Sequence, residues 1–492
     1  MLSDSLFISR LMSISSIQRQ SIITLSSTIA LTGLGFLSTI YFAHSLGPAP
    51  LGVYFLFLAY LGILNVLGDG GFGSAAVKRI SEGKEQNEYL SAFVFIRILL
   101  LTVSVTVLFY AEPYLKEVTS SGLFFWLLLA LIVSVFSSIA AGGVYGTGKV
   151  GVSQISLIAD AFSRIFFQIT AVILGFGVAG LAGGFIGGLI VGGFLNLRYF
   201  DLKLVRFGLS HLKNLAGFSF WIFLASSGSL VFSYADTILI GFFMNPAEVG
   251  IYRTALQLTS IATFTTLAFQ TVLYPKISNW GIQRQVTEIE NSLARAWTYS
   301  LFLAIPTCIG GWILGEDLLY FLYGASFVEG KSALFFLLIV QVVNVFTNLG
   351  TMSLNALNRP KHAFLVIFIA CITNILLDIV LIPVLGITGA AVATLIAMTF
   401  NAVGALVLLS RVISVKVEYK PIKNILYSAG LMGIFLLLIH FFLPITHIVV
   451  LLTVVVVGAG IYILTLFRLD RKIHDELRDL SINLGVPWPV RL

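Results

Sequence analysis

The amino-acid sequence predicts an all-α polytopic membrane protein of about fourteen transmembrane helices, and three observations carry this prediction. The 492 residues are 58% hydrophobic and only 10% charged, whereas a soluble domain carries roughly 25% charged residues. The mean hydropathy is +1.00. Apolar runs of about 20 residues, the length that crosses the hydrocarbon core of a bilayer, recur along the whole chain.

Each apolar run is expected to form a helix, because backbone groups in hydrocarbon must satisfy their own hydrogen bonds. Short breaks rich in glycine and proline, such as 47–50 and 245–246, are expected to be turns between neighbouring helices. The predicted spans are 21–43, 51–78, 90–111, 122–144, 152–175, 178–198, 215–243, 249–274, 292–314, 331–354, 362–384, 387–410, 424–443 and 446–467.

Lysine and arginine are distributed unevenly between the two sets of connections. One set holds only Lys116, Arg253 and Lys331, while the other set and the two chain ends hold nearly all the rest. Basic connections face the cytoplasm. An even number of spans therefore predicts a multi-pass protein of the cell (plasma) membrane with both termini in the cytoplasm. The net charge of +7 then reflects topology and contact with membrane lipids, and we expect no nucleic-acid partner.

The chain also contains an internal repeat. At an offset of 198 residues, Gly52 aligns with Gly250 and Tyr54 with Tyr252, and at an offset of 209 residues the run 177–182 aligns with 386–391. Six spans in each copy give the copies the same orientation, so the sequence predicts two parallel six-helix lobes related by a pseudo-two-fold axis along the membrane normal, with a cleft between them. Two C-terminal helices follow the second lobe.

The repeat sets the expected domain boundaries. They are a cytoplasmic N-terminal arm (1–20), an N-lobe (21–199), a cytoplasmic inter-lobe loop (200–214), a C-lobe (215–410), the last two helices with their preceding basic loop (411–467) and a cytoplasmic amphipathic tail (468–492). Closely spaced glycines in span 178–198 are expected to let helices approach closely within a lobe. These glycines are Gly183, Gly184, Gly187, Gly188, Gly192 and Gly193.

Ionisable and strongly polar residues inside the predicted spans are the candidates for the substrate cleft. A charge at the centre of a bilayer costs at least ~2.5 kcal/mol, so the few that occur there are functional candidates by default. Arginines could hold an anionic head group, and carboxylates could balance them or carry a coupling ion. The candidates are Arg97, Arg164, Arg253, Asp69, Asp160, Asp236, Asn374 and Asp378.

The predicted orientation and a rise of about 1.5 Å per residue give each candidate a depth. Asp69, Arg97, Asp160 and Arg164 are expected in the cytoplasmic half of the N-lobe, and Asp236, Arg253 and Asp378 in the outer half of the C-lobe.

Purely structural roles compete with the functional ones. Asp160 and Arg164, at positions i and i+4, could form an internal ion pair. Arg97 could extend its side chain to the cytoplasmic interface, and Arg253 could lie among the outer head groups. Asp69 and Asp236 could cap or break a helix beside a bend.

The sequence favours no cofactor, no metal site and no enzymatic activity. The six histidines are scattered and the two cysteines lie far apart in apolar runs, so neither a metal-binding pattern nor a disulfide framework is expected. The chain has no GxxxxGK[ST] motif for a nucleotide. It also lacks the DxxD carboxylate cluster that a membrane-embedded glycosyltransferase or prenyltransferase would need.

The residues from Ala43 to Gly83 resemble the first two helices of the polysaccharide transporter family. These proteins are the O-antigen-type lipid-linked oligosaccharide flippases of the multidrug/oligosaccharidyl-lipid/polysaccharide exporter superfamily. Where related proteins carry an Asp-Leu-Gly-Leu-like sequence, this chain has Asp69-Gly70-Gly71-Phe72. The runs similar to later helices are Tyr234–Thr237, Val249–Tyr252, Leu354–Lys361 and Gly386–Ala391.

This resemblance implies a flippase that moves a polyprenyl-(pyro)phosphate-linked oligosaccharide from the cytoplasmic to the outer leaflet by alternating access, for surface polysaccharide or glycan biosynthesis. Energy would come from an ion gradient, with H+ or Na+ as the coupling ion, or from use of the product outside, and glycan-assembly enzymes are candidate partners. The alternative is a cation-coupled multidrug or small-metabolite exporter of the same architecture. An exporter predicts a cleft of carboxylates and aromatics, whereas a flippase predicts arginines or lysines.

Overall fold

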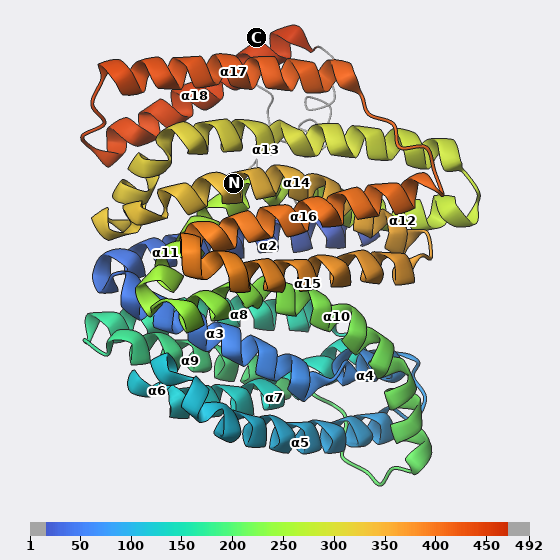
Figure 1. Cartoon of the computed structure of the whole chain (residues 1–492). Helices are drawn as coiled ribbons and strands as arrows, with labels where there is room; N and C mark the ends of the chain where they lie inside the picture. The colour runs from blue at the N-terminus through green and yellow to red at the C-terminus, as the bar shows by residue number, and fades with distance from the viewer. Residues whose placement is uncertain (1–15, 471–492) are drawn as a thin grey trace, which may run out of the picture. The chain divides into compact units, whose positions relative to one another are not determined.

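The computed structural model of the chain is built from helices (Figure 1). It describes residues 16–470, without the side chains of 16–29, 218, 220–222, 224–227, 229 and 230. The predicted arm 1–20 and tail 468–492 therefore lie largely outside the described residues. The long helices are α2 (Ser16–Leu46), α3 (Pro48–Asp69), α5 (Gln86–Ala111), α7 (Phe124–Gly146), α8 (Val150–Ile173), α9 (Gly177–Arg198), α10 (Leu209–Phe243), α12 (Phe264–Ile282), α13 (Val286–Tyr323), α14 (Lys331–Ala356), α15 (Pro360–Leu385), α16 (Ile387–Ser410), α17 (Tyr419–Phe442) and α18 (Ile448–Leu469).

Shorter helical segments connect several of these helices. They are α4 (Phe72–Ser81), α6 (Lys116–Ser120), α11 (Pro246–Thr259) and three 3₁₀ turns, η1 (Glu112–Tyr114), η2 (Ser260–Thr263) and η3 (Ala325–Gly330). Within residues 16–470, twelve helical segments are long and apolar enough to cross a membrane. Helices α2 and α10 add the shorter apolar stretches Ala30–Leu46 and Val231–Phe243. The all-helical membrane fold is thus as predicted, while the count of fourteen spans and the orientation stay predictions.

The predicted span 51–78 is interrupted, because the chain leaves the helical conformation between α3 and α4. Gly70 and Gly71 adopt left-handed φ angles of 54° and 78°, which favour glycine. A Cβ on Gly71 would also lie 2.4 Å from the carbonyl oxygen of Ser219 on α10. Gly70 and Gly71 therefore allow the bend between α3 and α4, and Gly71 also allows α10 to approach closely.

The predicted span 249–274 is also interrupted, by the 3₁₀ turn η2. Hydroxyl groups around this turn donate hydrogen bonds to carbonyl oxygens three residues earlier, from Thr259 to Leu256 (2.7 Å) and from Ser260 to Gln257 (2.6 Å). Such local bonds compete with the α-helical pattern and tighten the backbone. A run of hydroxyl side chains thus divides this span into α11 and α12.

One compact unit comprises residues 34–254 and 371–390. Helix α3 packs against α5, α7, α9 and α10, and α5 and α7 lie side by side (Figure 1). A buried cluster of apolar residues from α4 and α5, with Leu215 of α10, forms a core at one end of these helices. All eight candidate site residues belong to this unit.

The other compact unit comprises residues 255–370 and the chain from 391 onward, together with the start of α2. Its central element is α13, which packs against α12, α14, α17 and α18. The Tyr462 hydroxyl of α18 donates a hydrogen bond to the Phe302 carbonyl of α13 (2.7 Å). The last two helices are therefore joined to α13 by both apolar and polar contacts.

The glycines of α9 bring this helix close to two neighbours, as predicted. A Cβ on Gly184 would lie 2.6 Å from the backbone nitrogen of Gln168, and one on Gly188 would lie 2.7 Å from Cβ of Arg164, both on α8. On another face, a Cβ on Gly183 would lie 3.1 Å from the Trp126 ring of α7. Only glycine permits this spacing.

The two repeat copies touch each other through equivalent glycines. A Cβ on Gly52 of α3 would lie 1.6 Å from the carbonyl oxygen of Pro246, and one on Gly250 of α11 would lie 2.1 Å from the carbonyl oxygen of Pro48. Pro48 and Pro246 are themselves related by the offset of 198 residues. A reciprocal contact of this kind is what two segments make across a two-fold axis. It agrees with the internal repeat, while the pseudo-two-fold axis between the lobes stays a prediction.

Replacing Gly52 by alanine should destabilise the protein, because the new methyl group meets backbone atoms that no side-chain rotation can move. Overpacking of this kind typically costs about 1–3 kcal/mol. Thermal unfolding in detergent should show a lower midpoint for Gly52→Ala and for Gly250→Ala. Gly35→Ala is the matched control, since a Cβ there meets nothing within 4 Å. Equal midpoints for all three variants would contradict the close contact.

Candidate functional site

The eight predicted site residues form three groups. Asp69 and Arg97 lie at the end of α3, Asp160 and Arg164 lie near Tyr54 of α3, and the other four, Asp236, Arg253, Asn374 and Asp378, lie on α10, α11 and α15, with Arg253 beside Phe55. The first group joins Asp69 to Arg97 of α5.

The guanidinium of Arg97 is enclosed by protein partners. Its side chain is only 2% exposed. Nη1 lies 3.1 Å from Oδ1 of Asp69 and also donates to the carbonyl oxygen of Gly68, while Nη2 donates to the Ser138 hydroxyl of α7 (2.6 Å). The same oxygen of Asp69 accepts a hydrogen bond from the backbone N–H of Gly73 (3.2 Å). The pair therefore fixes the α3–α4 bend, and Arg97 does not extend to an interface.

The second group contains Asp160 and Arg164 of α8. Their charged groups do not close into an ion pair, and Oδ1 of Asp160 accepts no hydrogen bond from any described residue. The Arg164 guanidinium lies over the Phe185 ring of α9, 5.6 Å from its centroid, and close enough to Tyr54 to act on its hydroxyl electrostatically. One turn further on, Nε2 of Gln168 donates to that hydroxyl (2.7 Å).

Asp69 and Arg164 lie in different groups. Arg164 lies near Tyr54, and the fifteen residues from Tyr54 to Asp69 span about 22 Å of helix at 1.5 Å per residue. The placement of both residues in the cytoplasmic half of the N-lobe stays a prediction.

The third group gathers on α10, α11 and α15. The Tyr252 hydroxyl donates a short hydrogen bond to Asp236, and the carboxyl group of Asp378 lies within hydrogen-bonding reach of that of Asp236. Asp378 and Asn374, one turn apart on α15, are both fully buried. No other described residue donates a hydrogen bond to either oxygen of Asp378. Two carboxylates this close repel each other unless a proton or a cation lies between them.

Arg253 borders the third group. It is half-buried, and its guanidinium lies 5.7 Å from the ring centroid of Phe55. Its hydrogen bond to the Ser233 carbonyl is long (3.5 Å). Among residues 16–470, no carboxylate forms an ion pair with Arg253 or Arg164. Tyr54 and Phe55 are neighbours in sequence, so two incompletely neutralised guanidinium groups lie beside the same turn of α3.

Sequence reasoning missed the uncharged members of these groups: Tyr54, Phe55, Ser138, Gln168, Phe185 and Tyr252. The internal repeat aligns Tyr54 with Tyr252 and could have identified this pair. A search for charged residues does not find the others, because neutral side chains are common in membrane spans. Among the described residues, no group of three or more His, Cys, Asp or Glu side chains could hold a metal ion.

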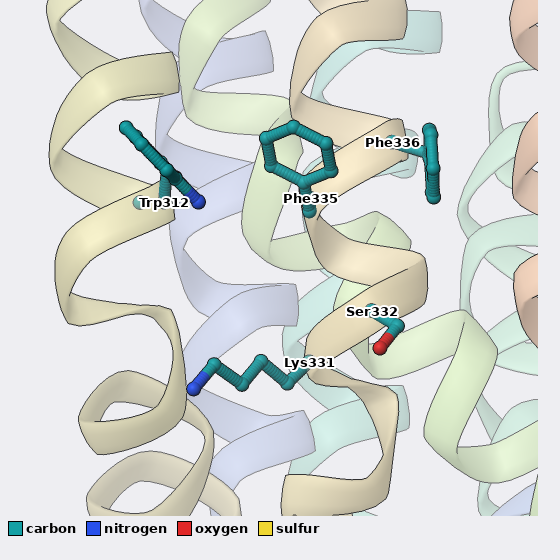
Figure 2. Close-up of a pocket in the computed structure, with 6 residues that line it drawn as sticks. Trp312, Lys331, Ser332, Phe335 and Phe336 are labelled. Atoms are coloured by element: carbon teal, nitrogen blue, oxygen red, sulfur yellow. The ribbon is translucent and has the colours of Figure 1, made fainter.

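A pocket lies elsewhere, between α13 and α14 of the other unit (Figure 2). Its volume is about 240 Å³ and it is lined by Gly311, Trp312, Lys331, Ser332, Phe335 and Phe336. Trp312 of α13 faces Phe335 of α14, with ring centroids 6.1 Å apart, and Phe336 turns away (Figure 2). Lys331 pairs with Glu316 (2.6 Å). The pocket contains none of the candidate residues.

Comparison with known proteins identifies the class of this fold. Over 92% of this chain and 99% of the other, the fold resembles that of the lipid II flippase MurJ in an inward closed conformation, with a TM-score of 0.74 and 18% identity. It also resembles an inward-facing multidrug resistance MATE family transporter of the MOP superfamily, with a TM-score of 0.63 and 15% identity over 77% of this chain and 94% of that one. The fold is that of a membrane transporter.

The family is shown by sequence. A model of the polysaccharide biosynthesis protein family matches residues 42–332, and this chain belongs to that family. The probable low-salt glycan biosynthesis flippase Agl15 of Haloferax volcanii is 28% identical over 82% of this chain and 86% of its own. The probable flippase AglR of the same organism is 27% identical over 95% of this chain and 99% of its own. The predicted family and the prediction of a transporter rather than an enzyme are confirmed.

Arg97 and Arg164 should respond differently to truncation. Arg97→Ala removes the donor to the Gly68 carbonyl and to the Ser138 hydroxyl and the cation beside Asp69, and a buried group left unsatisfied costs about 1–3 kcal/mol. Thermal unfolding of purified protein should therefore show a clear loss of stability for Arg97→Ala and a smaller one for Arg164→Ala. An Arg97→Ala protein as stable as the wild type but inactive in transport would instead assign this arginine to substrate binding.

Proposed function

We propose that this transporter flips a lipid-linked oligosaccharide, carried on a polyprenyl phosphate or diphosphate, across the cell membrane. The substrate would move from the cytoplasmic to the outer leaflet by alternating access, and both chain ends would lie in the cytoplasm beside the enzymes that assemble the glycan. The glycan and the phosphate cannot cross hydrocarbon unaided. A protein path with fixed cations would replace their hydration.

The observation that carries this proposal is the guanidinium of Arg253. It is half-buried, lies against the Phe55 ring and makes no ion pair with a described residue. A guanidinium presents a planar set of N–H donors that matches phosphate oxygens. Arg164 is a second candidate for binding the phosphate. Arg97 is not, because its guanidinium already bonds Asp69 and Ser138. The name of Agl15, a probable low-salt glycan biosynthesis flippase, supports a role in glycan biosynthesis, and that of AglR, a probable flippase, supports flipping.

Energy would come from a cation gradient, since the sequence has no nucleotide-binding motif. Asp236 and Asp378 are the residues that we assign to this coupling, with Asn374 beside them. Two adjacent buried carboxyl groups offer oxygen ligands to Na+ or a shared position for H+. The same pair also favours the second candidate function, a cation-coupled exporter of small molecules, so the two functions must be separated by their cargo.

Flipping can be measured as the leaflet distribution of a fluorescent polyprenyl-linked sugar in proteoliposomes. Arg253→Ala should slow it at least about tenfold, because a hydrogen bond to a charged group contributes about 1.5–3 kcal/mol. Lys331→Ala is the matched control: this lysine pairs with Glu316 and should flip at the wild-type rate. Wild-type rates no faster than those of empty liposomes would sink the flippase proposal.

Asp378→Asn should separate coupling from substrate binding. The amide has nearly the shape of the carboxyl group but cannot hold a proton or a charge-balanced cation. Flipping by this variant should lose its acceleration by an imposed Na+ or H+ gradient. Asp317→Asn is the control, since this aspartate lies beside His440 in the other unit. Proton uptake driven by small drugs, without flipping of the sugar lipid, would select the exporter instead.

A further inference from the structure

A stripe of uncharged polar side chains runs along the second half of α14. Between Lys331 and Arg359 the chain has no charged residue, and α14 belongs to a segment long and apolar enough to cross a membrane. Residues three or four positions apart lie on the same face of a helix. This polar stripe consists of Gln341, Asn344, Asn348, Thr351 and Asn355. Fourteen residues separate its first member from its last, which is about 21 Å along the helix axis.

Helices α13 and α16 pack against α14 on either side of the polar stripe and leave it partly open. A Cβ on Gly311 of α13 would lie 2.7 Å from Cδ1 of Leu338, and a Cβ on Gly350 of α14 would lie 3.1 Å from Cβ of Ala405 of α16. At about 100° of rotation per residue, Leu338 and Gly350 stand on opposite sides of the stripe. Its last four members keep part of their surface exposed.

At its first residue the polar stripe meets the break between α11 and α12. Nε2 of Gln341 donates to the Thr259 hydroxyl (3.0 Å), and Nδ2 of Asn344 donates to Oε1 of Gln341 (3.1 Å). The turn η2 follows directly, inside a candidate membrane span, with the partly exposed residues Ser260 and Thr263. Irregular backbone at membrane depth is tolerated only where it is buried in protein or lines a water-filled cavity. The broken helix and the stripe therefore indicate the same polar path.

The first repeat copy uses the corresponding position for its own fold. Helices α7 and α14 each end two residues before a left-handed residue, Gly148 and Asn358. Counted back from these helix ends, Ser138 corresponds to Asn348. Ser138 accepts a hydrogen bond from Arg97, whereas the side-chain amide of Asn348 bonds no described residue. The second copy thus places a larger hydrogen-bonding group here and gives it no partner among the described residues.

We propose that the polar stripe binds the sugar residues of the lipid-linked oligosaccharide as they cross the membrane. A side-chain amide offers both donors and an acceptor, which matches sugar hydroxyls, since each of these donates and accepts. Because the stripe carries no charge, it suits a neutral cargo, whereas an organic cation needs carboxylates and a phosphate needs cations. This inference rests on the proposed flippase function. It assigns the phosphate to Arg253 and the glycan to α14.

Two fluorescent lipids test the proposal, a polyprenyl diphosphate that carries a short chain of hexoses and the same lipid without sugar. Asn348→Leu should weaken equilibrium binding of the sugar lipid to the purified full-length protein about five- to thirtyfold, the loss of one or two hydrogen bonds. Its affinity for the sugarless lipid should equal that of the wild type. Arg253→Ala should weaken the binding of both lipids, because both carry the phosphate.

Thermal unfolding of the same variants separates binding from folding. Asn348 has no bonded side-chain partner among the described residues to lose, so Asn348→Leu should unfold at the wild-type temperature or above it. Thr399→Leu is the matched control, because this threonine bonds the Leu395 carbonyl of its own helix (2.7 Å) and lies beside the exposed Phe400 of α16. It should bind both lipids as the wild type does. If Asn348→Leu does not fold, Asn355→Leu, two turns further along the stripe, replaces it with the same expected result.

The outcomes separate this proposal from the flippase proposal. An equal loss of affinity for both lipids in Asn348→Leu, or no loss for either, would overturn the sugar-binding role of the stripe. A wild type that binds the two lipids equally well would overturn it too. In each of these cases the flippase proposal stands if the wild type still flips the sugar lipid faster than empty liposomes do, and it is overturned if the wild type does not.

Discussion

Neutralisation of charge inside helices that cross a bilayer is the constraint on which the rest of this structure depends. Water is absent there, so each charge needs a partner from the protein or from what the protein carries. Arg97 meets this need through Asp69, Ser138 and the Gly68 carbonyl, and in doing so it fixes the bend between α3 and α4. Arg253 and the Asp236–Asp378 pair are less completely satisfied. The difference separates Arg97, which stabilises the fold, from the charged residues that we propose for binding substrate and coupling ion.

Close helix packing at glycine residues allows this arrangement of charged side chains. Gly188 lets α9 lie against α8 at the level of Asp160 and Arg164, and Gly52 with Gly250 brings α3 and α11 into backbone contact. Three residues after each of these last two glycines stand Phe55 and Arg253, which the repeat relates and which face each other. A larger residue at the contact would move the guanidinium away from the ring. The packing of these glycines and the position of the Arg253 guanidinium are therefore one feature of the fold.

The repeat explains how one architecture serves two different clusters. The two aligned tyrosines bond different partners: Tyr54 of α3 accepts a hydrogen bond from Gln168 of α8, and Tyr252 of α11 donates one to Asp236 of α10. One copy carries Asp236 and Asp378 with Arg253 beside them, and the other carries Asp160 and Arg164 with Gln168 one turn further on. The family membership and the fold shared with flippases and exporters agree with this division.

The sequence by itself determined the helical membrane fold, the repeat, the close glycine contacts and the family. Long apolar runs, internal similarity and clustered small residues are all properties of the linear sequence and can be recognised there. It also selected the charged candidates, since charge is rare in a span. Tertiary structure alone decided their roles. The partners of Arg97, the position of Arg164 near Tyr54 and the approach of Asp236 to Asp378 all depend on which helices become neighbours and on how far each is shifted along its axis. Those distances are set by packing between segments far apart in the chain, which no local pattern records.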